Sequence, residues 1–106
     1  MANYTYILYS DMAATVFEWD IHKDVENKLK HGVSFALAQR AFFDPKRVIH
    51  ENLTHSRNEM RFFCFGRIEE DVLTARFTLR MDAIRIIGAG YWRMGRSIYE
   101  RENQIH

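Results

Sequence analysis

Residues 72–89, VLTARFTLRMDAIRIIGA, decide the expected fold. Alternate residues in the first half are apolar, so an extended chain separates two faces: Leu73, Ala75, Phe77 and Leu79 on one, and Thr74, Arg76, Thr78 and Arg80 on the other. This alternation predicts strands over 72–79 and 83–89. Only Met81 and Asp82 lie between them, which indicates a tight hairpin. The stretch therefore predicts an antiparallel pair with one apolar face.

Upstream of this pair the sequence predicts two more strands, at 48–51 and 60–67, and a brief one at 16–19. Residues 60–67 are apolar on both faces in their middle, which is typical of a central strand. The acidic residues 69–71 supply a charged turn before the next strand. The strands from residue 48 onward are expected to form an antiparallel meander.

Two helices are expected before the meander. The first begins after the N-cap Asp20 and ends at Gly32. Its apolar stripe is expected to pack on the core and its polar line to face solvent or a ligand; these are Ile21, Val25 and Leu29, and Lys23, Asn27 and His31. The second is capped by Ser34, packs through Phe35, Ala38 and Phe42, and stops at Asp44 and Pro45. With a short helix over 93–101, the order predicts an α+β fold with helices on one face of an antiparallel sheet.

Length and charge narrow the class of protein. At 106 residues and 47% hydrophobic content the chain is expected to form one globular domain. Fifteen Lys and Arg against fourteen Asp and Glu give a net charge of +1, which does not by itself indicate a nucleic-acid partner. However, every basic residue after Lys46 other than histidine is an arginine. Guanidinium groups suit phosphate recognition, although they also solvate a sheet face or pair with the acidic turn.

The sequence does not indicate a disulfide, a metal site, a membrane helix or a signal peptide. The single Cys64 cannot form an intrachain disulfide and is expected to be a buried side chain in a reducing compartment. The five histidines lack metal-ligand spacing, and no apolar run is long enough for a membrane helix. Residues 1–16 lack Lys and Arg, unlike a signal peptide, so a cytoplasmic location is expected. The glycines of Gly88-Ala89-Gly90 are expected to mark a bend or close backbone approach.

The densest polar cluster lies at 55–61. Glu59 and Arg61 are two apart, so on a strand both side chains point the same way, and His55 can approach from the preceding loop. A carboxylate, a cation and an imidazole together can move a proton beside a phosphate. An ordinary salt-bridged loop is the alternative interpretation.

The N-terminal half resembles a known family. Phe17-Glu18-Trp19-Asp20, Lys23, Asn27, residues 30–35 (KHGVSF), Ala38, Phe42 and Asp44-Pro45 are similar to the signature of BrnT toxins of bacterial type II toxin–antitoxin systems. His55, Glu59 and Arg61 match the HxxxExR element of that family. The resemblance covers residues 17–101, which leaves residues 1–16 as an N-terminal appendage and 102–106 as a tail.

The resemblance implies a fold, an activity and partners. The fold would be RelE-like, with two N-terminal helices packed on an antiparallel meander and a short C-terminal helix. The activity would be metal-independent RNA cleavage that inhibits translation and needs no cofactor. The partner would be a BrnA-type ribbon-helix-helix antitoxin, in a heterotetramer that contacts operator DNA only through the antitoxin and represses its own operon.

The site residues follow from the resemblance together with the residue chemistry. The catalytic candidates are Glu59, Arg61, His55, Arg80, Arg93 and His31, with arginines on the phosphate and Glu59 or His55 moving the proton. The RNA-binding candidates are Lys23, Lys30, Arg85, Trp92 and Arg96. A cap of the first helix is the alternative role for His31. Trp19 and Trp92 can stack on bases, and core packing is the favoured role for Trp19. Because residues 88–96 carry fewer cations than in many relatives, a weak or inactive module that binds RNA or antitoxin remains the alternative function, as does a purely interacting subunit.

Overall fold

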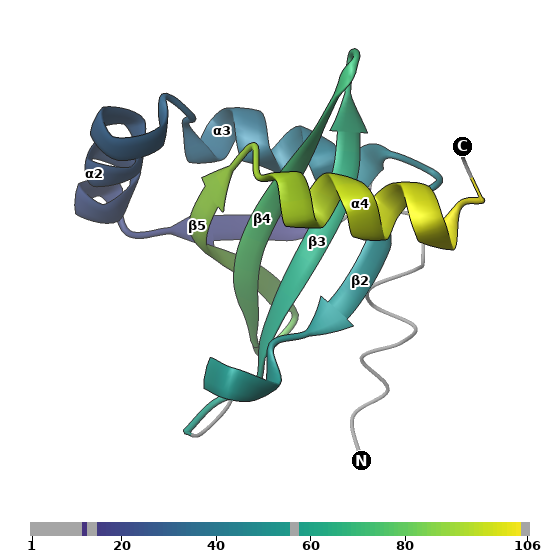
Figure 1. Ribbon diagram of the computed structural model, residues 1–106. Helices are drawn as coiled ribbons and strands as arrows, with labels where there is room; N and C mark the ends of the chain where they lie inside the picture. The colour runs from purple at the N-terminus through teal and green to yellow at the C-terminus, as the bar shows by residue number, and fades with distance from the viewer. Residues whose placement is uncertain (1–11, 13–14, 56–57, 105–106) are drawn as a thin grey trace.

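The computed structural model describes residues 12, 15–55 and 58–104, and within them the backbone but not the side chain of His55. Five strands form one sheet in the order β1-β5-β4-β3-β2 (Figure 1). They are β1 (Val16–Trp19), β2 (Val48–Glu51), β3 (Arg61–Ile68), β4 (Asp71–Arg80) and β5 (Ala83–Gly90). The predicted meander is confirmed, because β2, β3, β4 and β5 pair antiparallel in sequence order.

The first strand departs from the predicted sheet. β1 runs parallel to β5, with Phe17 opposite Ile84 and Trp19 opposite Ile86. The expectation of a wholly antiparallel sheet is therefore wrong, and the sheet is mixed. The meander leaves β5 with an open edge, and β1 reaches that edge through the long connection that parallel pairing requires. Most of the predicted appendage lies outside the described residues, but Met12 is buried in the core.

The predicted helix ends are confirmed. In α2 (Ile21–His31) the backbone N–H groups of Lys23 and His22 donate to the Asp20 carboxylate, which lowers the pKa of Asp20. Gly32 closes the helix with φ of 68°, a left-handed conformation that favours glycine. The Ser34 hydroxyl caps α3 (Phe35–Ala38), which continues as the 3₁₀ turn η2 (Gln39–Phe43). A second 3₁₀ turn, η3 (Leu53–His55), follows β2.

The main core lies between α3, η2 and what we call the inner face of the sheet. As predicted, Phe35, Ala38 and Phe42 are fully buried there. The rings of Phe42 and Phe77 meet edge to face at 5.0 Å between centroids. Cys64 is also fully buried, as predicted, and burial raises the pKa of its thiol.

The last helix, α4 (Arg93–Glu102), lies on the opposite side, which we call the outer face (Figure 1). Tyr99 is 1% exposed and packs in a second cluster with Val48, Phe65 and Val72. Its hydroxyl donates to the Asp44 carboxylate at 2.7 Å. Burial is the larger cause of the raised pKa of Tyr99, and this hydrogen bond raises it further. The prediction that all helices share one face is therefore wrong, because helical periodicity identifies an apolar helix side but not the sheet face that it meets.

The apolar stripe of α2 does not pack on the core as predicted. Ile21, Val25 and Leu29 are 68%, 50% and 82% exposed, whereas Asn27 is 7% exposed. The Asn27 amide donates to the carbonyl oxygens of Val33 and Ala89, both at 2.9 Å, and accepts from the Ala89 N–H at 3.1 Å. These hydrogen bonds dock α2 through Asn27, whereas Lys23 and His31 of the predicted polar line are exposed. The predicted packing of the apolar stripe is therefore wrong.

Candidate active site

The strand registers bring arginines from three adjacent strands onto the outer face. Arg61 of β3 lies opposite Thr78 of β4, and Thr78 lies opposite Arg85 of β5. Arg76 projects from β4 on the same face, two residues before Thr78. We call Arg61, Arg76 and Arg85 the arginine face. Three guanidinium groups on one surface can surround a phosphate.

Acidic side chains lie at both ends of this face. The Glu59 carboxylate lies 3.8 Å from the Arg61 guanidinium, and both side chains are about two-fifths exposed. The Glu18 carboxylate lies 3.5 Å from the Arg85 guanidinium. Ion pairs this exposed contribute roughly 0–1 kcal/mol, so a substrate phosphate can compete for the guanidinium groups. Glu59 lies before β3 rather than on it, so this ion pair is also what the alternative of a salt-bridged loop predicts.

Arg76 occupies space that a glycine leaves open. A Cβ at Gly88 would lie 2.3 Å from Nη2 of Arg76, so the guanidinium lies directly over the backbone of β5. The Nε of Arg76 is buried and has no hydrogen-bond partner among the described residues. The period-two pattern of its strand predicted Arg76 on the polar side, but Arg76 was not among the predicted site residues. The close approach to the backbone predicted at Gly88 is confirmed.

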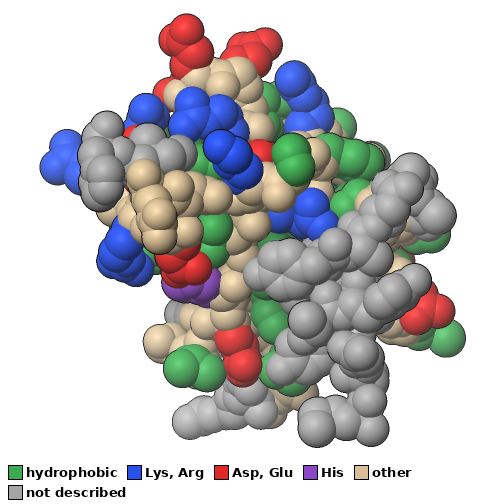
Figure 2. Space-filling view, turned by 90° about the vertical axis from the view of Figure 1, so that its right-hand side faces the viewer, with side chains coloured by type: hydrophobic (Ala, Val, Ile, Leu, Met, Phe, Trp, Pro, Cys, Tyr) green, Lys and Arg blue, Asp and Glu red, His purple; other side chains and the backbone are tan. Residues whose placement is uncertain are grey.

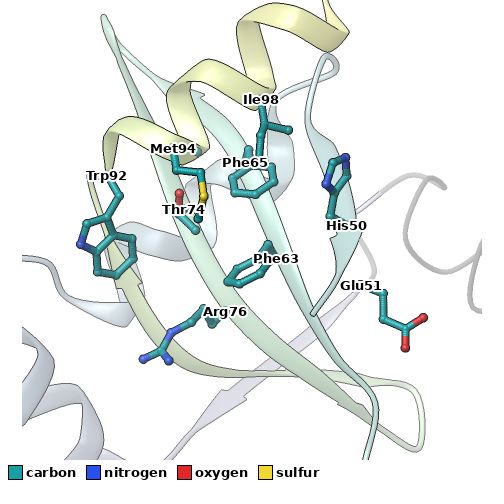
Figure 3. A pocket seen from close by; sticks show the side chains of 10 residues that line it. His50, Glu51, Phe63, Phe65, Thr74, Arg76, Trp92, Met94 and Ile98 are labelled. Carbon is teal, nitrogen blue, oxygen red and sulfur yellow. The ribbon is translucent and has the colours of Figure 1, made fainter. Parts of the chain in front are cut away.

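A cavity of about 420 Å³ opens between α4 and the outer face (Figure 3). Phe63 and Phe65 lie between Trp92 on one side and His50 on the other, and Arg76 lies at the lower edge. The His50 ring is paired with the Glu102 carboxylate of α4. No sequence pattern predicted this cavity, because it forms only where α4 crosses the outer face.

His31 and Trp92 come together although they are far apart in the sequence. Their rings meet edge to face at 5.1 Å between centroids. A Cβ at Gly90 would lie 2.6 Å from the Trp92 ring, so the indole packs closely over the end of β5. Trp92 is nevertheless 37% exposed and lines the cavity. The two candidates therefore lie beside the cavity rather than beside Glu59.

The other predicted residues are more scattered. Arg80 extends the outer face toward the hairpin, two residues beyond Thr78. Arg93 is exposed at the start of α4, and Arg96 is paired with Asp71 at 3.4 Å and Glu100 at 3.5 Å. Lys23 and Lys30 are exposed on α2. The His55 side chain lies outside the described part of the chain.

The surface charge is mixed rather than absent. On the face seen in Figure 2, Lys and Arg side chains gather in the upper half, with Asp and Glu side chains above and below them. Among the described residues, no group of three or more His, Cys, Asp or Glu side chains is placed to hold a metal ion. The near-zero net charge therefore results from interspersed charges.

The model of one protein family matches residues 19–94, which is most of the chain. That family is described as the ribonuclease toxin BrnT of type II toxin–antitoxin systems. The chain belongs to the BrnT family. This BrnT chain is thus a ribonuclease toxin of a type II toxin–antitoxin system, which includes an antitoxin. The matched region contains the whole arginine face, Glu59 and Trp92.

No curated protein sequence matches this BrnT chain. In the part of the chain that the structure describes, no helix is both long and apolar enough to cross a membrane.

Proposed function

We propose that this BrnT chain is a metal-independent endoribonuclease that cleaves RNA on the arginine face. The observation that carries the proposal is the position of Arg61, Arg76 and Arg85 on three adjacent strands, with Glu59 at 3.8 Å from Arg61. Cations gathered at a developing negative charge stabilise a phosphoryl transition state. A carboxylate beside them can take or give a proton.

The substrate supplies its own nucleophile in this mechanism. The 2′-hydroxyl of RNA attacks the adjacent phosphorus and loses its proton, and the bond to the 5′-oxygen of the next nucleotide breaks. The 5′-oxygen takes up a proton, and the products are a 2′,3′-cyclic phosphate and a 5′-hydroxyl. Arg61 and Arg76 stabilise the negative charge on the oxygens of the pentacoordinate phosphorane, and Arg80, Arg85 and Arg93 hold the strand on either side of it.

Glu59 is the proposed base for the 2′-hydroxyl, because it is the carboxylate in contact with Arg61. Its pair with that arginine is exposed and weak, so a bound phosphate can displace it without a large cost. His55 is the proposed proton donor to the leaving oxygen, and His31 is the second candidate for that role. Lys23, Lys30, Arg85, Trp92 and Arg96 are proposed RNA contacts.

The proposed partner is a BrnA-type ribbon-helix-helix antitoxin, bound in a heterotetramer that represses its own operon. Support comes from the family, which implies an antitoxin, and from the sequence resemblance. The same resemblance supports a RelE-like fold, inhibition of translation and a cytoplasmic location. Co-purification with the product of a neighbouring ribbon-helix-helix gene, followed by native mass spectrometry, tests the partner and its stoichiometry.

The catalytic proposal is tested with the chain expressed alone. We expect growth arrest, and purified protein should cut single-stranded RNA equally well with and without EDTA. Arg61→Ala should reduce the cleavage rate roughly 10²–10³-fold, the usual effect of losing one transition-state contact. Glu59→Gln should reduce it by about 10²–10⁴-fold while keeping the side-chain size.

Arg40→Ala is the matched control, because Arg40 is an exposed arginine of η2, which packs against the inner face. It should cleave RNA like the parent chain. Loss of cleavage in EDTA would refute metal independence. Normal growth with intact RNA would refute the proposal that the chain is an enzyme. The alternative would then be an inactive module that binds RNA or antitoxin, in which Arg61→Ala changes only the affinity of that binding.

A further inference from the structure

We propose that the cavity between α4 and the outer face binds one nucleobase of the RNA and so selects the position at which the strand is cut. The inference rests on the proposed function, since it deepens the substrate recognition of the same face. The cavity volume of about 420 Å³ lies within the range of roughly 300–1,000 Å³ common for small-ligand pockets.

Aromatic rings supply the stacking surface. The Phe63 and Phe65 rings are stacked at 5.7 Å between centroids with planes 19° apart, so they form a continuous apolar floor. Trp92 stands at the side of this floor, fixed by His31 and by its close packing over Gly90 (Figure 3). A planar base inserted here stacks on rings that are already ordered, which keeps the entropic cost of binding low.

Two residues that line the cavity each carry a buried polar atom. Thr74 is 4% exposed, and its hydroxyl has no hydrogen-bond partner within the described residues. The same holds for the buried Nε of Arg76 at the lower edge. The Thr74 hydroxyl faces Gly95 of α4, whereas the Arg76 guanidinium lies at the lower edge of the cavity, where the phosphate attached to a bound base can bond it. An apolar side chain from a protein partner would leave this guanidinium without an anion.

The position of the cavity fits a strand that continues onto the arginine face. Phe63 and Arg76 are opposite each other in the register, and the next outer-face pair along the strands is Arg61 with Thr78. Two residues of a strand span about 6.6 Å, so the proposed base and phosphate sites are neighbours. The cavity would hold a base next to the phosphate that is cut.

The test uses single-stranded RNA in which every 2′-hydroxyl is methylated, so that binding is measured without cleavage. Fluorescence anisotropy gives the Kd for a labelled oligonucleotide and for a set with one abasic position each. We expect one abasic position to weaken binding roughly ten-fold, the usual effect of losing a stacked base. Trp92→Ala should weaken the intact oligonucleotide by a similar factor and remove its discrimination of the abasic position.

Trp92→Phe should restore binding, because any aromatic ring can stack on a base. Tyr91→Ala is the matched control, since Tyr91 is an exposed aromatic neighbour that does not line the cavity. It should bind like the parent chain. Thermal unfolding of each variant confirms that the fold is retained.

The outcomes separate this inference from the proposed function. Base-dependent binding by a chain that cuts no RNA would support the cavity and refute the enzyme. Cleavage of unmodified RNA without any abasic effect on binding would refute the cavity and support the enzyme. If Trp92→Ala leaves RNA binding intact but weakens binding of the antitoxin, the cavity holds a partner side chain and the inference is overturned.

Discussion

Replacing Asn27 with alanine should lower the free energy of unfolding by about 3 kcal/mol. The buried amide makes three hydrogen bonds to the backbone of Val33 and Ala89, at 2.9, 2.9 and 3.1 Å. Each is worth roughly 1 kcal/mol, and their loss leaves buried backbone groups unsatisfied. Because a small domain is stable by only about 5–15 kcal/mol, this single change should be readily measured.

Urea unfolding followed by circular dichroism measures the effect. With a slope of about 1–3 kcal/mol per molar urea, the midpoint should fall by roughly 1–3 M. Asn27→Leu keeps nearly the same side-chain size without the hydrogen bonds, so it should be destabilised as much as Asn27→Ala. That agreement would assign the loss to hydrogen bonding rather than to a cavity.

Asn103→Ala is the matched control. The Asn103 amide also donates to two backbone carbonyl oxygens, those of Lys46 and Tyr99, at 3.1 and 3.0 Å. It lies nearer the surface, where water can replace it, so the loss should stay within about 1 kcal/mol. If Asn27→Ala is no more destabilising than Asn103→Ala, the docking of α2 through Asn27 is refuted.

Gly88→Ala should weaken RNA binding roughly ten-fold in an anisotropy titration but leave the urea midpoint unchanged, because the three atoms nearest the new Cβ all belong to the movable end of Arg76. Gly66→Ala should instead lower the midpoint by an amount equivalent to about 1–3 kcal/mol, since its Cβ would lie 2.1 Å from a backbone carbonyl oxygen of η2. Cys64 should not react with a thiol reagent at pH 8 until urea unfolds the chain, because burial raises its pKa and blocks access. Burial also raises the pKa of Tyr99, so the folded phenol stays neutral where the unfolded one ionises; the free energy of unfolding should fall as the pH rises above about 10, and less steeply in Tyr99→Phe.

Local patterns predicted the elements of this chain well. The period-two alternation of residues 72–79 and the two-residue hairpin are present in β4 and β5. The helix boundaries at Asp20, Gly32 and Ser34 depend on capping groups within a few residues, which a sequence displays directly. Interactions between neighbours in the chain were therefore predictable.

The arrangement of elements in space was less predictable. The apolar stripe of α2 predicted burial, but the hydrogen bonds of Asn27 to a strand 62 positions later turned that stripe outward. Likewise, Arg76 became a site residue only because Gly88 lies opposite it in the register. Both outcomes depend on contacts between residues far apart in the sequence, and the periodicity of a local stretch cannot predict such contacts.

The glycines beneath the site have a genetic consequence. A Cβ at Gly88, Gly90 or Gly95 would lie within 2.6 Å of Arg76, Trp92 or Thr74, respectively. Every amino-acid replacement reached by one base change in a glycine codon adds a Cβ, so each of these three codons is one mutation away from a disturbed site. Bacteria that lose the antitoxin and survive should often carry mutations at these codons. Sequencing the survivors would show how frequently the toxin is inactivated by replacement of one of these glycines.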